Sequence, residues 1–195
     1  KDAGLYYGDN RGNRSFDIKQ WAAIKAWTKI SKNKKINKKE AEIMYKYIRE
    51  LQDLSFRRDK FWQDLPDYQE YDFKGLKDWC GLDLPDESKD KPWWEILQRN
   101  FKPEQITYFI RLLKRYGARQ LNAEPQIIID TIHSVKGGEA DNVLIYSKTN
   151  WPSAFRNKNI SEKSDEKRVY YTGVTRAKNT LHILSTDYKY NYPIG

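Results

Sequence analysis

Residues 126–146 read QIIIDTIHSVKGGEADNVLIY, and this stretch decides the fold class. The apolar run at 126–131 predicts a strand that is buried on both faces. A second such run follows at 143–146 and a third at 180–185, with a helix expected between them from about Glu162 to Lys178. Strands that alternate with helices indicate an α/β fold with a parallel sheet.

Upstream of this stretch, apolar residues recur at helical spacing. A helix capped by Asp17 is expected, followed by a second from about Lys38 to Asp53 and a third from Pro103 to Gly117. The expected apolar stripe of the third helix consists of Ile106, Phe109, Ile110, Leu113 and Tyr116.

Composition narrows the class of protein. Lys and Arg number 36 against 27 Asp and Glu, so the net charge of +9 favours an acidic partner, nucleic acid first, over a generic basic surface. The single cysteine excludes a disulfide within the chain and fits a reducing, cytoplasmic location. With one Cys and two His, no metal site is expected, and no apolar run is long enough to suggest a membrane partner.

Seven tryptophans and fourteen tyrosines make the chain rich in aromatic residues. Such side chains can stack on bases, and a Trp-rich surface between 55 and 102 could dock another protein. Core packing is the preferred interpretation, because short helices need large side chains to bury enough area.

The polar segment after the first predicted strand leaves the carboxyl end of that strand, where open α/β sheets bind their ligands. The pair Gly137-Gly138 permits close approach of the backbone to a ligand. Potential phosphate donors are Thr131, His133, Ser134 and Lys136, and Glu139 could accept a hydrogen bond from a sugar hydroxyl. A polar turn between two strands explains the same residues equally well.

Residues 168–179 carry a second polar cluster. On a helix, Arg168, Thr172, Thr175 and Asn179 would share one face with Arg176 at its edge, opposite Tyr170, Gly173, Val174 and Ala177. Lys178 would project away from Arg176. A solvated helix face is the usual outcome of such a pattern. Threonines are poor helix formers on such a face, however, and an arginine grips phosphate oxygens through its planar fork.

These two segments together resemble motifs V and VI of the superfamily 1 DNA helicases of the UvrD/Rep type. The matching residues are Thr131, His133, Ser134, Lys136, Gly137 and Glu139, then Arg168, Tyr171, Gly173, Thr175, Arg176, Ala177 and Lys178. The resemblance covers roughly residues 120–187 and, more loosely, residues 4–30, which begin GLYYGDNRGNRSFDIKQW. Gly138 departs from the pattern, since the family usually has a large apolar residue there.

The resemblance implies a parallel RecA-like sheet flanked by helices, with an inserted all-helical subdomain. Residues 1–30 and 119–195 would form the second RecA-like motor domain, and residues 31–118 would be the helical insertion.

The resemblance also implies roles for individual residues. Arg176 would be the catalytic arginine finger that reaches the γ-phosphate of ATP, and Glu139 and Gly137 would help to bind the nucleotide. The expected contacts with single-stranded or partly duplex DNA are Thr131, His133, Ser134, Lys136 and Thr172. Arg168 would hold its helix in place through an ion pair, and Lys178 would have a surface or structural role.

The sequence contains no GxxxxGK[ST] phosphate loop. If the resemblance holds, ATP with Mg²⁺ is bound mainly by the first RecA-like domain of the same protein, and this chain, which begins at Lys1, is the carboxy-terminal part of a helicase used in DNA repair or replication. The chain alone is then not expected to hydrolyse ATP. The alternative is a non-catalytic nucleic-acid-binding module.

Overall fold

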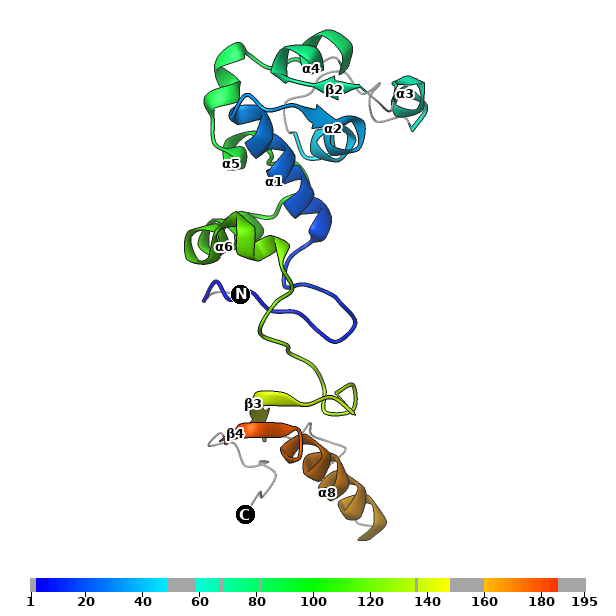
Figure 1. Ribbon diagram of the computed structural model, residues 1–195, viewed down its shortest axis with the longest axis vertical. Coiled ribbons are helices and arrows are strands. Elements are labelled where there is room, and N and C mark those ends of the chain that lie inside the picture. The colour runs from blue at the N-terminus through cyan, green and yellow to red at the C-terminus, as the bar shows by residue number, and fades with distance from the viewer. Residues whose placement is uncertain are drawn as a thin grey trace. The chain divides into compact units, whose positions relative to one another are not determined.

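The computed structural model describes residues 3–48, 59–66, 69–80, 82–135, 137–147 and 160–185. The chain divides into two compact units (Figure 1). The first consists of Lys1–Gly8 with Asn13–Ile127, and the second of Asp9–Gly12 with Ile128–Gly195.

The first unit is mainly helical. Its helices are α1 (Ile18–Ser31), α2 (Lys38–Tyr45), α3 (Asp59–Asp64), α4 (Phe73–Cys80), the 3-10 helix η2 (Asp86–Asp90), α5 (Trp93–Ile96) and α6 (Pro103–Asn122). Strands β1 (Ile36–Asn37) and β2 (Glu70–Tyr71) form a short antiparallel pair.

Side-chain caps begin two of these helices. The carboxylate of Asp17 accepts the N–H of Lys19 at 2.7 Å, which confirms the predicted start of α1. A reciprocal pair of bonds between Asn37 and Glu40 begins α2 at Lys38, as predicted. The expected end of α2, near Asp53, lies outside the described residues.

The predicted helix end at Gly117 is confirmed as an interruption of α6, because Gly117 has a non-helical backbone with φ 70° and ψ 164°. A second helical segment, which was not predicted, follows it up to Asn122. The predicted stripe is confirmed at Ile106, Phe109, Leu113 and Tyr116, which lie in the core or pack against it. Ile110 is exposed, so its place in the stripe was wrong, and Tyr108 and Leu112 are buried in addition.

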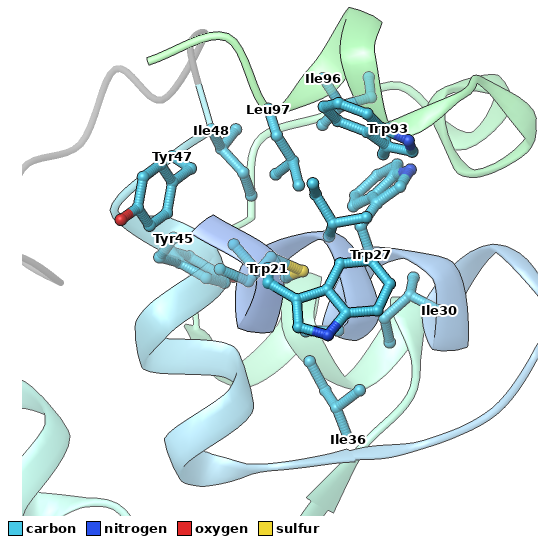
Figure 2. Packing of buried hydrophobic residues seen from close by; sticks show 14 of the residues in the cluster. Trp21, Trp27, Ile30, Ile36, Tyr45, Tyr47, Ile48, Trp93, Ile96 and Leu97 are labelled. Atoms are coloured by element: carbon cyan, nitrogen blue, oxygen red, sulfur yellow. The ribbon is translucent and has the colours of Figure 1, made fainter. Parts of the chain in front are cut away.

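Tryptophan side chains fill the core of the first unit (Figure 2). Trp21, Trp27, Trp62 and Trp93 are each 6% exposed or less. Trp27 also donates its indole N–H to the carbonyl oxygen of Lys91 at 3.1 Å. Core packing is therefore confirmed for these four residues, while Trp94 is 40% exposed.

The second unit combines helix α8 (Ile160–Val174) with strands β3 (Ala140–Tyr146) and β4 (Ala177–Leu184). The two strands pair in parallel, with a bulge between Ala140 and Asn142. The parallel pairing of the last two predicted strands, with a helix between them, is thus confirmed (Figure 1).

The predicted strand at 126–131 is not formed. The side chains of Ile127, Ile128 and Ile129 are 42%, 47% and 57% exposed. In β3 and β4 only Ile145 is buried, so burial on both faces was also a wrong prediction. Within the described residues this sheet has two strands, and α8 packs against it at Ile145, so the neighbours that would bury the remaining apolar side chains on both faces are lacking.

The structure therefore contains helices and strands with a small parallel sheet. A complete RecA-like sheet, the inserted subdomain and their boundaries at 1–30, 31–118 and 119–195 stay predictions. No helix in the described part of the chain is long and apolar enough to cross a bilayer.

Candidate functional site

Close packing of α8 on the sheet positions the end of the helix. A methyl group added at Gly173 would lie 3.0 Å from Cδ1 of Ile145 and 3.3 Å from Cδ1 of Ile132. Tyr170, on the same face of α8, is buried and donates its hydroxyl to the carbonyl oxygen of Ser147 at 3.3 Å. The predicted apolar face of this helix is therefore confirmed at Tyr170 and Gly173.

Helix α8 ends at Val174, four residues earlier than expected. The N–H of Ala140 donates to the carbonyl oxygen of Arg176 at 3.0 Å, and Ala177 pairs with Ala140 as the first residue of β4. The hydrogen bonds between β3 and β4 thus replace the helical hydrogen bonds at this point. Arg176 lies in a turn between helix and strand, so its predicted place on a helix face was wrong.

The guanidinium of Arg176 is held by three hydrogen bonds. Nε donates to the carbonyl oxygen of Thr172 at 3.1 Å, Nη1 to that of Gly138 at 3.2 Å, and Nη2 to the hydroxyl of Thr175 at 3.3 Å. A guanidinium has five N–H donors. Among the described residues these bonds occupy three of them, so two remain for an anionic ligand.

The bond to Gly138 joins the two polar segments that sequence analysis selected. Glu139 follows directly, and its carboxylate lies 3.3 Å from Nζ of Lys178. Lys178 is in β4, not on the helix as predicted, but its expected structural use fits this pair. Both side chains are more than half exposed, so the pair contributes about 0–1 kcal/mol.

Thr172 in α8 and Thr175 in the turn after it both bond back to carbonyl oxygens of α8. Thr172 donates its hydroxyl to the carbonyl oxygen of Arg168 at 2.9 Å, and Thr175 to that of Tyr171 at 3.0 Å. Bonding back to the preceding turn explains threonine on an open helix face without any ligand. A DNA contact by Thr172 stays a prediction.

The segment that begins at Thr131 forms a compact polar turn. Ser134 donates its hydroxyl to the carbonyl oxygen of Thr131 at 2.7 Å and accepts the hydroxyl of Thr131 at 3.1 Å. His133 is exposed, and Gly137 has a φ of 86°, a conformation that favours glycine. Lys136, the remaining predicted DNA contact, lies outside the described residues.

The predicted site residues therefore form two groups. Gly138 and Glu139 meet Arg176 and Lys178, whereas Thr131 and Ser134 bond to each other. Within the described residues no hydrogen bond joins the second group to Arg176.

Sequence analysis missed Asp130, which supports the polar turn. One carboxylate oxygen accepts the N–H of Thr131 at 2.7 Å, and the other accepts the N–H of Asn10 at 3.1 Å. The Ser134 hydroxyl, these two N–H groups and nearby Arg11 hold the pKa of Asp130 below its usual value. In the sequence, Asp130 is a single carboxylate that follows three isoleucines. Nothing in that pattern indicates its partner Asn10, which is 120 residues away.

The family model for the UvrD-like helicase C-terminal domain matches residues 18–188. The chain belongs to this family.

A further similarity joins this helicase domain to a probable DNA helicase II homolog of Mycoplasma pneumoniae (strain ATCC 29342 / M129 / Subtype 1). The two are 36% identical over 95 residues, which cover 46% of this chain and 13% of that protein. No solved structure matches the chain.

The described residues of the helicase domain also bear on magnesium. They contain no group of three or more His, Cys, Asp or Glu side chains positioned to hold a metal ion.

Proposed function

We propose that this chain is the carboxy-terminal motor domain of an ATP-dependent DNA helicase or translocase. Membership of the UvrD-like family supports the assignment of the chain as a helicase domain. The chain spans only 13% of the Mycoplasma relative that it matches. ATP with Mg²⁺ would bind mainly to a first RecA-like domain of the same protein, against which this domain would close.

The observation that carries the proposal is the bond from Arg176 to the carbonyl oxygen of Gly138. It brings a cation with two remaining donors next to Glu139, whose carboxylate is half-exposed and able to accept a sugar hydroxyl. A nucleotide offers both groups, a phosphate and a ribose. Gly137 and Gly138 have no side chain beyond the backbone and would let the nucleotide approach closely.

In the proposed reaction, Arg176 stabilises negative charge on the γ-phosphoryl oxygens as water displaces ADP. A donor that is already held in place needs no rearrangement when the charge develops. The three hydrogen bonds of Arg176 would hold its guanidinium in place before the reaction. Arginine fingers contribute about 10³–10⁵-fold to the turnover number of nucleotide hydrolases.

The proposed DNA contacts are Thr131, His133, Ser134, Lys136 and Thr172. Hydroxyl, imidazole and ammonium groups are the donors that proteins use for phosphate oxygens. The net charge of +9 favours the approach of such a polyanion.

The test is DNA-stimulated ATP hydrolysis by the complete protein that carries this chain. Arg176→Ala should lower the turnover number about 10³-fold or more, with ATP binding retained, because the lost interaction forms fully only in the transition state. Arg176→Lys should rescue little, since an ammonium lacks the planar fork. The chain by itself should show no ATP turnover.

Lys167→Ala is the matched control. Lys167 is an exposed residue of α8, the helix that precedes the turn of Arg176, so the variant removes a charge of the same sign outside the site. Near-normal ATP hydrolysis in Arg176→Ala would contradict the finger assignment, as would an equal loss in both variants.

A non-catalytic nucleic-acid-binding module is the second candidate, favoured by the net charge alone. It would bind DNA with a steep dependence on salt but would show no coupling of DNA to ATP turnover in the complete protein. A Trp-rich docking surface is less well supported, because four of the tryptophans are buried in the core.

A further inference from the structure

Asp130 connects two segments of the second unit that are far apart in the sequence. Through one carboxylate oxygen it accepts the N–H of Thr131 at 2.7 Å, inside the turn proposed to contact DNA. Through the other it accepts the N–H of Asn10 at 3.1 Å. Asn10 belongs to the loop at 9–12, which lies in the same compact unit as the turn.

The loop has its own internal order. Its ends are joined by a bond from the N–H of Gly12 to the carbonyl oxygen of Asp9 at 3.2 Å, and Gly12 has a φ of 82°. The side-chain amide of Asn10 adds a second link to the turn, since it donates to the carbonyl oxygen of Ser134 at 3.4 Å. The loop therefore supports the turn at both Asp130 and Ser134.

The charge of Asp130 has the wrong sign for a direct contact with DNA. A carboxylate beside phosphate groups repels them, and every unpaired negative charge on such a surface weakens binding. A carboxylate instead provides two oxygen atoms that accept strong hydrogen bonds from backbone N–H groups. One oxygen of Asp130 bonds to the turn, and the other bonds to the loop at 9–12.

We propose that Asp130 is a positioning residue, which fixes the Thr131–Ser134 turn on the loop at 9–12 so that the turn can contact single-stranded DNA. This inference rests on the proposed DNA contacts of Thr131, His133 and Ser134. It adds a residue that acts through them and does not touch the DNA.

The direction in which Asp130→Asn changes the affinity for DNA distinguishes a positioning role from an effect of surface charge. Asp130→Asn removes the negative charge and turns one acceptor into an NH₂ group that faces an N–H donor. Loss of repulsion alone would tighten DNA binding. Loss of positioning should weaken it by about three- to tenfold, the effect of one ordinary hydrogen bond.

The experiment measures fluorescence anisotropy of a labelled single-stranded oligonucleotide, at constant salt, in the complete protein. Asp141→Asn is the control, because it removes the same charge from an exposed position in the same unit. We expect weaker binding for Asp130→Asn and unchanged or tighter binding for Asp141→Asn, with the melting temperature and the KM for ATP unchanged in both.

Asn10→Ala provides an independent route to the same junction, including the case in which Asp130→Asn does not fold. It removes the side-chain bond to Ser134 and should also weaken DNA binding. The double variant should lose less than the product of the two single losses, because both substitutions loosen the same junction between the loop and the turn. His133→Ala shows whether the turn contacts DNA at all.

Three outcomes decide the matter. Weaker binding in Asp130→Asn and Asn10→Ala, with non-additive losses, supports the inference. Unchanged or tighter binding in both, while His133→Ala binds more weakly, overturns positioning and leaves the proposed function intact. Failure of the unaltered protein to bind single-stranded DNA overturns the proposed function and the inference with it.

Discussion

Replacement of Gly173 by alanine tests the packing that places Arg176. Gly173 lies in the last turn of α8, and its added methyl group would be 3.0 Å from Cδ1 of Ile145. Ile145 is 5% exposed and is the buried residue of the sheet. It therefore has little room to move, whereas the half-buried Ile132, 3.3 Å from the same methyl group, can yield.

Two opposing effects set the magnitude. Overpacking of a filled site costs about 1–3 kcal/mol. Alanine is better than glycine inside a helix by about 1 kcal/mol, which offsets part of that cost. We expect Gly173→Ala to destabilise the second unit by about 1 kcal/mol, with α8 displaced from β3 and the bond from Arg176 to Gly138 weakened.

Hydrogen exchange of backbone amides is the suitable assay. Six of the seven tryptophans, all except Trp151, belong to the first unit, so tryptophan fluorescence would report mainly on that unit. A loss of about 1 kcal/mol raises the exchange rate of protected amides about fivefold. This increase should appear in β3 and β4, while peptides from α1 serve as the internal reference.

Gly138→Ala is the control substitution. A methyl group there would have Val135 as its nearest neighbour, with the carbonyl oxygen at 3.4 Å, an ordinary contact. Its effect on exchange in β3 and β4 should be within about twofold. Slower exchange in Gly173→Ala than in the unaltered protein would refute the packing argument, because helix propensity would then outweigh the contact with Ile145.

Two further predictions concern the first unit. Trp27→Ala should lower the free energy of unfolding by about 3–5 kcal/mol, because the residue is 1% exposed and its indole N–H bonds to Lys91. Urea denaturation measures this, and Trp94→Ala, at a 40% exposed position, should cost far less. Burial raises the pKa of Cys80 from 9.0 to about 12, so a thiol reagent at pH 8 should label it only after unfolding. Since the unfolded thiol loses its proton first, stability should fall as the pH rises from about 9 to about 12; a constant stability over that range would contradict the buried position.

Local features of this protein were predictable from the sequence. The caps at Asp17 and Asn37 involve residues two or three positions apart, and the last two strands are short apolar runs that pair as expected. The polar segments of the candidate site were also recognisable, since each is continuous in the chain.

Features that depend on distant neighbours were not predictable. The run at 126–131 has the composition of a buried strand, yet burial requires a second layer and pairing requires an adjacent strand. Gly117 interrupts α6 as its residue type suggests, yet the helical segment that follows it, in which Leu121 is buried, was not predicted.

The sequence by itself determined the family, the polar segments of the candidate site and the succession β3, α8, β4, because each is carried by continuous stretches of the chain. Only the tertiary structure decided where Arg176 lies. Its turn forms because Ala140, 36 residues earlier, bonds to its carbonyl oxygen and starts the ladder of β4. The same holds for Asp130, whose second partner is supplied by the far end of the chain.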